Sequence, residues 1–303
     1  MAKRKEFGSL YDLFAAIPDE QAAIDWFREI RWANGEYCPY CGHDEIYTFT
    51  DRRTFKCADC RQRFSIRVGT IFEYSKIPLR KWLAAIWVIT SHKKGIASTQ
   101  LARDLGITQK SAWFMLHRLR HAARTRSFNR QLRGTVEVDE TFFGGKDKNK
   151  PVHRRGRKEK KTAVFGVLER QGELRAKPIK SVSVMTDEIR KNVAPGMRLM
   201  TDEWPAFQYF SGRYEHGSVK HSDNEYVRKG TDVHINTIEG FWSQLKRQVY
   251  GIHHWVSAKH LHRYVDESVW RYNRRELGEV GRMREFLTRV DGRLTYPALI
   301  AKA

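Results

Sequence analysis

The chain has 303 residues, of which 56 are Lys or Arg and 35 are Asp or Glu, so its formal net charge is +21. This excess favours a polyanionic partner such as nucleic acid, because each phosphate that a protein neutralises releases a counterion. No apolar run approaches the roughly 20 residues of a membrane-spanning helix, and no signal peptide is visible, so we expect no membrane partner and a cytoplasmic location at the nucleoid. The length allows two or three domains.

The four cysteines of the chain all lie in its first fifth. "IPDEQAAIDWFREIRW" has helical apolar spacing and a plausible cap at Asp19. Two CxxC pairs follow it, separated by fifteen residues that include the strand-like segments "EIYTFT" and "RTFKC". Two such knuckles can supply the four-sulfur tetrahedron of a structural Zn²⁺, whose binding would provide the folding energy of a small ribbon. The predicted ligands are Cys38, Cys41, Cys57 and Cys60.

The next segment predicts three helices. "PLRKWLAAIWVITSH" has a helical apolar stripe, and two shorter helices follow, the first capped by Ser98 and ended by Gly106, the second capped by Thr108. Helix, glycine-containing turn and helix is the helix-turn-helix layout, in which the second helix enters the major groove of double-stranded DNA. The alternative is a three-helix bundle that only supports its neighbour. The predicted DNA contacts are Gln109 and Lys110 near the groove, and Arg118 and Arg120 near the backbone.

A polar, basic stretch at 125–133 predicts a linker, after which strands dominate. In "GTVEVDETFFGG", Val136 and Val138 alternate with Glu137 and Asp139, as one buried and one open face require. The basic loop "GGKDKNKPVHRRGRKEKK" either clamps DNA or is a solvated tip. "TAVFGVLER" and "LRAKPIKSVSV" predict two further strands of a meander. A short helix capped by Thr186 and a strand ending at Asp202 follow, and the strand turns into another helix.

Three strands, a helix, a fourth strand and a later helix are the order of a ribonuclease H-like domain. The chain is therefore predicted to be an α+β multidomain protein with a mixed sheet flanked by helices. Asp139 would lie on the central strand and Asp202 at the end of its neighbour, with a third ligand on the later helix. Oxygen ligands from separate elements suit Mg²⁺, and two such ions about 4 Å apart can catalyse phosphoryl transfer.

The motifs "CPYCG", "CADCRQRFSIRVGTIFE", "VEVDETFFGGK", "TDEWPAF" and "HINTIEGFWSQLKR", in this order, resemble those of bacterial insertion-sequence DDE transposases with an N-terminal zinc ribbon, the ISXO-like group. The resemblance covers residues 20 to 280. It implies an enzyme that binds the terminal inverted repeats of its element, cleaves there and joins the ends to target DNA. It also implies two Mg²⁺ or Mn²⁺ ions, a homo-oligomer on DNA, and Asp139 and Asp202 as the first two metal ligands.

The third metal ligand has two candidates in "HINTIEGFWSQLKR". Glu239 stands in the family's "NTIEGFW" position, and Lys246, seven residues later, shares its helix face and would reach a DNA phosphate. Asn236 is the competitor, because some members of the group are described with Asn as the third residue. Both residues are structural if Asn236 caps the helix and Glu239 bonds back to it.

These patterns divide the chain into 1–72 with the zinc ribbon, 73–124 with the helix-turn-helix, a linker at 125–133, the catalytic domain at 134–290 and a tail at 291–303. A different class of function is a catalytically silent DNA-binding regulator derived from a transposase. A third is a nuclease with the same fold that cuts without joining.

Overall fold

The computed structural model describes residues 7–124, 130–144, 161–203 and 212–301. The chain forms two compact units. Unit 1 contains residues 1–123 together with 274–303, and unit 2 contains residues 124–273. Within the described ranges, no helix has the length and apolar character needed to cross a membrane.

Unit 1 begins with two helices and a small sheet. Helices α1 (Leu10–Ala16) and α2 (Glu20–Arg31) precede the antiparallel strands β1 (Ile46–Thr48), β2 (Thr54–Cys57) and β3 (Arg63–Ser65). Asp19 accepts a hydrogen bond from the amide of Ala22, which confirms it as the cap of α2. The predicted zinc ribbon is therefore present as a three-stranded sheet.

Three helices follow the ribbon: α3 (Leu79–Ser91), α4 (Ser98–Leu105) and α5 (Gln109–Ala122). Gly106 ends α4 with a φ of 57°, a left-handed conformation that glycine adopts without strain, and Thr108 caps α5. The helix-turn-helix layout is confirmed. The prediction that Ser98 caps α4 is wrong, because Ser98 is the first helical residue and its hydroxyl accepts a hydrogen bond from Gln109.

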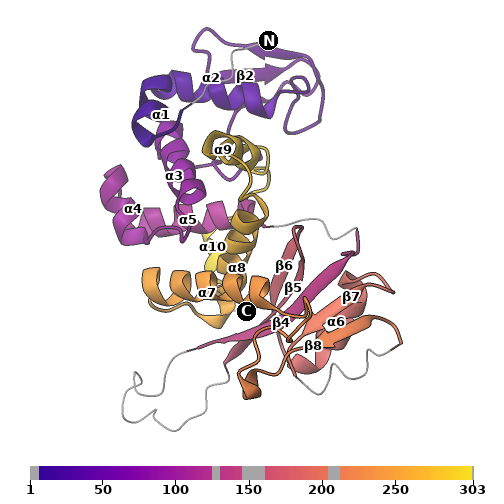
Figure 1. The fold of residues 1–303 in the computed structure, drawn as a ribbon. Helices are drawn as coiled ribbons and strands as arrows, with labels where there is room; N and C mark the ends of the chain where they lie inside the picture. Colours follow the sequence, from indigo (N-terminus) through magenta and orange to yellow (C-terminus); the bar gives the residue numbers. More distant parts are fainter. Residues whose placement is uncertain (1–6, 125–129, 145–160, 204–211, 302–303) are drawn as a thin grey trace. The chain divides into compact units, whose positions relative to one another are not determined.

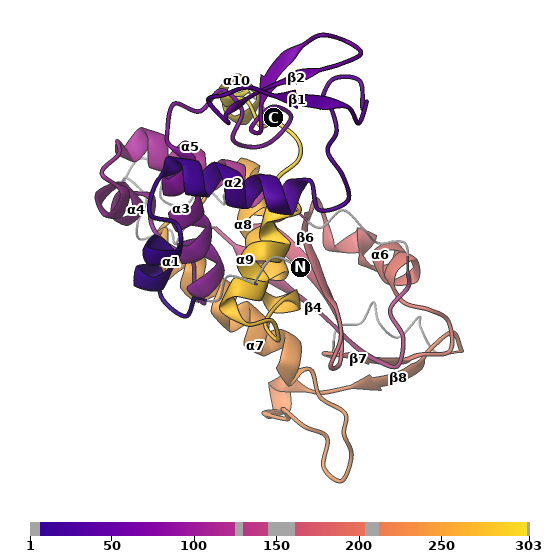
Figure 2. The same ribbon diagram turned by 90° about the horizontal axis from the view of Figure 1, so that it is seen from above.

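The C-terminal segment completes unit 1. Helix α9 (Glu279–Leu287) packs against α2 and α3, as Figure 2 shows, and α10 (Tyr296–Ile300) follows it. The amide of Ile71 donates to the carbonyl of Val290 at 2.8 Å. Unit 2 thus ends at residue 273, whereas the sequence analysis extended the catalytic domain to 290. The reason is that the apolar face of α9 is buried by the N-terminal helices.

Unit 2 is built on a five-stranded mixed sheet with the order β6-β5-β4-β7-β8. Strands β4 (Thr135–Phe143), β5 (Thr162–Glu169) and β6 (Leu174–Ile179) form the predicted antiparallel meander. Strand β7 (Arg198–Thr201) runs parallel to β4, and β8 (Glu215–Ser218) runs parallel to β7. This is the predicted ribonuclease H-like order with β4 at the centre. Strand β8 was not predicted.

Helices cover both faces of this sheet (Figure 1). Helix α6 (Met185–Asn192) lies on one face. It begins after Val184, so Thr186 is inside the helix and the prediction that it is the cap is wrong. Helix α7 (Asn236–Lys246), a π-helical turn at Arg247–Ile252 and α8 (Ala258–Asn273) lie on the other face.

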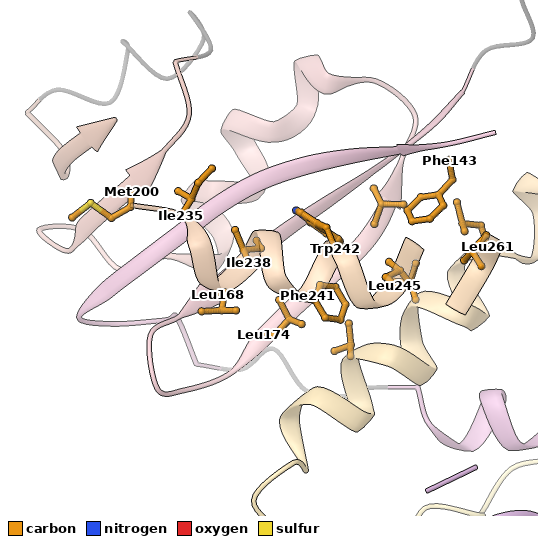
Figure 3. Close-up of a cluster of buried hydrophobic side chains, with 14 of the residues drawn as sticks. Phe143, Leu168, Leu174, Met200, Ile235, Ile238, Phe241, Trp242, Leu245 and Leu261 are labelled. Carbon is orange, nitrogen blue, oxygen red and sulfur yellow. The ribbon is translucent and has the colours of Figure 1, made fainter. Parts of the chain in front are cut away.

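The core beneath α7 explains another difference from the sequence analysis. Ile238, Phe241, Trp242 and Leu245 pack from α7 onto the sheet, as Figure 3 shows. Glu137 on β4 lies under this helix and is 0% exposed. The face of β4 that alternation predicted to be open is therefore covered. Residues 145–160, 125–129 and 204–211, which contain most of the predicted basic loop, part of the linker and the helix after Asp202, lie outside the described residues.

Candidate metal centres and DNA-binding surface

The four cysteine sulfurs converge at one point of the ribbon. All four Sγ atoms lie within 4.8 Å of one another, and the Cys38–Cys60 and Cys41–Cys57 pairs are each 3.6 Å apart. A tetrahedral zinc with bonds of about 2.3 Å separates its sulfurs by roughly 3.8 Å. The amide of Tyr40 donates to the sulfur of Cys38, as in a knuckle that turns around a metal. The donor set and spacing therefore fit a structural Zn²⁺.

The start of α5 is a solvent-exposed part of the helix-turn-helix. Gln109 and Lys110 are exposed in its first turn. Lys110 Nζ lies 5.4 Å from the ring centroid of Tyr296 in α10, and Phe114 meets the same ring edge-on. The first turn of α5 is thus available to DNA, while the C-terminal segment covers part of the next turn.

Arg118 and Arg120 are not on this surface. Arg118 is 6% exposed, and its guanidinium donates to the carbonyls of Ile71, Glu73 and Leu294 at 2.8, 3.0 and 3.2 Å. Arg120 is 1% exposed. The prediction that these two arginines approach the DNA backbone is wrong, because the C-terminal segment and the 71–73 turn enclose this part of α5.

Asp139 and Asp202 come together on neighbouring parallel strands. Thr135, Val136 and Glu137 of β4 pair with Arg198, Leu199 and Met200 of β7. The same register, continued by two residues, brings Asp139 beside Asp202, directly after the end of β7. Burial, together with the negative charges of Asp202 and Glu140, raises the pKa of Asp139 to about 8. Two carboxylates in this arrangement favour a cation between them.

Trp242 of α7 contacts Asp139 from the face of the sheet that α7 covers. Its indole nitrogen donates to Oδ2 of Asp139 at 2.9 Å, and the indole faces the sheet in Figure 3. The ring occupies the space above Gly166, the residue opposite Asp139 on β5, where an added Cβ would lie 2.6 Å from the Trp242 ring. Glycine at this position therefore lets the indole reach the aspartate.

The candidate third ligands lie near the start of α7. Glu239 is half-buried, and its Oε1 lies 3.3 Å from Nε2 of His221. Asn236 is exposed, and its backbone amide donates to Nδ1 of His234. Helix α7 begins after Ile235, which has no polar side chain, so Asn236 is the first helical residue and the capping-box alternative is wrong. Lys246 is exposed at the end of the helix.

Two contacts define how α7 runs along β4. Glu137 accepts a hydrogen bond from the amide of Ile238, and Asp139 accepts one from Trp242. The two strand residues are about 6.6 Å apart along β4, and the two helix residues are about 6 Å apart along α7. The helix and the strand therefore advance side by side in the same direction. Glu239 lies between the two contacts, whereas Asn236 precedes both.

The sequence of each unit matches a model of one transposase group. Residues 131–273 match the ISXO2-like transposase domain, and residues 18–63 match the transposase zinc-ribbon domain. The chain belongs to the ISXO2-like transposases. Its DDE-type domain implies metal-dependent phosphoryl transfer on DNA.

Two individual proteins resemble this transposase. An uncharacterized protein in transposable element ISH50 of Halobacterium salinarum is 29% identical over 268 residues, covering 81% of this chain and 88% of the relative. That relative comes from an archaeon, not from a bacterium. A pre-cleavage Mos1 transpososome is 15% identical over 74% of this chain and 82% of that chain. Its TM-score of 0.24 is too low for a comparison of folds.

The acidic residues of the transposase fit an oxygen-liganded cation, but not in a single tight cluster. Among the described residues, only the four cysteines bring three or more ligand atoms within 4.8 Å of one another. Asp139 and Asp202 form a pair, and Glu239 is turned to His221. A centre with two ions about 4 Å apart needs no such mutual cluster, because one carboxylate can serve both ions.

Three polar residues near this pair were missed by the sequence analysis. Glu140 is half-buried, and burial together with the charge of Asp202 raises its pKa to about 7. Trp242 was not singled out in the sequence, and Glu137 was predicted only as a residue of an open face. The signal for Glu137 and Glu140 is their position on either side of Asp139 in "VEVDET". No sequence signal distinguishes Trp242 from its apolar neighbours.

Proposed function

We propose that this transposase binds the terminal inverted repeats of its insertion sequence and catalyses divalent-metal-dependent DNA cleavage and strand transfer. The observation that carries the proposal is the Asp139–Asp202 pair on the central strands, with α7 aligned beside it. The raised pKa of Asp139 is the expected signature of carboxylates arranged for a cation.

Asp139, Asp202 and Glu239 would hold two Mg²⁺ or Mn²⁺ ions, with Asn236 as the alternative to Glu239. When bound, such ions activate a water or a 3′-hydroxyl and stabilise the departing oxygen. The alignment of α7 and β4 supports Glu239, because this residue lies between the two contacts that join the elements.

The other residues of the site position these carboxylates and the DNA. Trp242 orients the carboxylate of Asp139 by its hydrogen bond, and His221 lies against Glu239. Lys246 follows Glu239 by two helical turns and places a positive charge on the same face, where it can contact a DNA phosphate.

The zinc ribbon and the helix-turn-helix would recognise the DNA. Gln109 and Lys110 are the groove-facing candidates, since they are exposed at the start of α5. Transposition requires two DNA ends to be handled together, so we propose a homo-oligomer on DNA. The DNA substrate places this activity in the cytoplasm, at the nucleoid.

The test uses purified protein, Mg²⁺ or Mn²⁺, and labelled duplexes made from the DNA that flanks its own gene. We expect nicked and joined products with wild type and none with Asp139→Ala. Comparison of Glu239→Gln with Asn236→Ala then identifies the third ligand. Nicked product without joined product would indicate a nuclease. Tight binding with no cleavage in either metal would indicate a catalytically silent regulator.

A further inference from the structure

Glu137 is a buried carboxylate that the proposed chemistry does not use. It lies on β4 two residues before Asp139 and is 0% exposed. Its oxygens accept hydrogen bonds from the hydroxyl of Thr237 and the amide of Ile238, both at 2.9 Å, and from Nε of Arg170 at 2.7 Å. Nδ1 of His234 lies 3.4 Å away. A buried charge is retained only where its partners are held in place.

Two of these four partners, Thr237 and Ile238, belong to the first turn of α7, and His234 lies two residues before the helix. The first amides of a helix have no partner within the helix and are usually capped by the preceding side chain. Ile235 precedes α7 and cannot provide such a cap. Glu137 provides it from the strand that also carries Asp139, and its negative charge stands at the positive end of the helix dipole.

Arg170 extends this connection to the loop before α7. It follows β5, and besides Glu137 it donates to the carbonyls of Asp232 and His234 at 3.0 and 2.7 Å. The carboxylate of Asp232 also accepts two hydrogen bonds from Arg198 of β7, at 2.8 and 2.6 Å. The entry to α7 is therefore bonded to β4, β5 and β7.

We propose that Glu137 and Arg170 are positioning residues that set the position of α7 along β4 and thereby fix where Glu239 lies relative to Asp139. The inference rests on the proposed function, because it concerns the third metal ligand. The apolar residues of α7 share one core cluster with Leu168 and Leu174, and such packing is non-directional. The hydrogen bonds to Glu137 and from Arg170 are directional, so they add a constraint on the position of the helix along the strand.

The test compares full-length Glu137→Gln and Arg170→Lys with a matched control, Arg175→Lys. Glu137→Gln keeps the shape but removes the charge, and Arg170→Lys keeps the charge but removes the planar donor set. Arg175 is a buried arginine of the same sheet, 4% exposed, whose guanidinium donates to Asn192, Arg130 and Glu173. All three variants are expected to lower the melting temperature.

Two measurements separate positioning from general stability. The first is amide hydrogen exchange, which should become faster at Ile238 and Glu239 in the Glu137 and Arg170 variants and not in the control. The second is Mn²⁺ titration followed by electron paramagnetic resonance and by cleavage. Its midpoint should rise roughly tenfold or more in the two variants and stay unchanged in the control, while binding of the DNA ends is retained.

The inference is overturned if exchange in α7 is unchanged, or if the Mn²⁺ midpoint of the two variants equals that of Arg175→Lys at equal loss of melting temperature. Failure of the proposed function has a different signature. In that case wild type itself neither cleaves nor binds Mn²⁺, whatever happens to exchange in α7.

Discussion

At the scale of single residues, Gly166 is a position where the sheet and α7 approach closely. A Cβ added to Gly166 would lie 2.6 and 2.7 Å from two carbons of the Trp242 ring. We therefore expect Gly166→Ala to cost about 1–3 kcal/mol and to slow cleavage, since the indole must leave Asp139. Urea unfolding and a cleavage assay measure both effects.

Gly240 is the matched control for this substitution. It lies inside α7, and an added Cβ would meet nothing within 4 Å. Gly240→Ala should stabilise the protein by about 0.5–1 kcal/mol through helix propensity and leave cleavage unchanged. Equal effects of the two substitutions would contradict the close approach at Gly166.

Substitutions of Arg118 and Lys110 should distinguish a basic residue with a structural role from one that binds DNA, since both lie on α5. Arg118→Ala leaves the carbonyls of Ile71, Glu73 and Leu294 without their donor, so we expect a loss of about 3 kcal/mol in stability. Lys110→Ala should keep the melting temperature and reduce the slope of log affinity for DNA against log salt by about one. An unchanged melting temperature for Arg118→Ala would restore this arginine as a DNA contact.

The raised pKa of Asp139 predicts that the stability of the protein depends on pH in the absence of divalent cations. Its pKa is about 8 in the folded protein, so the folded state keeps a proton that the unfolded chain releases above about pH 4. The stability should therefore fall as the pH rises from about 4 to about 8, by an amount on the order of a few kcal/mol. Melting temperatures at pH 5 and pH 8.5 should show a smaller fall for Asp139→Asn than for wild type. Asp187→Asn, whose carboxylate is 68% exposed, should behave as wild type does.

The residue types of the site could be predicted from sequence where spacing alone determines the chemistry. The cysteine pairs and the two aspartates are in this class, because each lies at a recognisable point of a local element. Arg118 and Glu137 could not be placed, since what covers them comes from residues far away in the chain. A basic residue on a helix is expected to be exposed as long as the distant segment that buries it is not known.

At the scale of elements, the ribbon should depend on its metal. Strands β1 to β3 have three or four residues each, and Phe55 and Phe64 are their main buried side chains. So small a core needs metal binding to fold. We expect Cys57→Ser to abolish zinc binding and to remove exchange protection from β2, while α7 keeps its protection. His43→Ala should retain a full equivalent of zinc. Protection of β2 in Cys57→Ser would show that the ribbon folds without metal.

Elements with a strong periodic pattern were predicted, whereas β8, which has no such pattern, was not. Helices α2 and α3 and strands β4 and β5 have apolar residues at the period of their structure. Strand β8 has the sequence "EHGS", with no apolar alternation and a glycine. It forms because β7 offers a free edge and because Gly217 fits closely against Met200 and Val233. Its hydrogen bonds therefore depend on a neighbour that is already in place.

At the scale of the whole molecule, the two ends of the chain fold together and the catalytic unit lies between them in sequence. Residues 274–303 belong to unit 1. Arg282 of α9 donates to the carbonyl of Thr90 at the end of α3, and the amide of Gly292 donates to the carbonyl of Gly69. Sequence patterns divide a chain into consecutive segments, so a domain made of both ends is not visible to them.

This arrangement predicts that the C-terminus supports DNA binding rather than catalysis. Truncation after Thr288 would remove Val290, Leu294 and Leu299, which are at most 5% exposed. It would also remove the carbonyl groups that accept hydrogen bonds from the amide of Ile71 and the guanidinium of Arg118. Burying each such side chain contributes about 1.5–3 kcal/mol, so unit 1 should lose several kcal/mol and the protein should bind DNA ends poorly. Hydrogen exchange in unit 2 should stay as in wild type.

Two point substitutions test the same prediction without truncation. Leu299 is 1% exposed and Ile300, its neighbour in α10, is 52% exposed. We expect Leu299→Ala to cost about 2–4 kcal/mol and to lower the affinity for DNA ends near the melting temperature, whereas Ile300→Ala should change neither. If Leu299→Ala instead loosened exchange in β4 and α7 while α3 and α5 kept theirs, the C-terminal segment would belong to the catalytic unit.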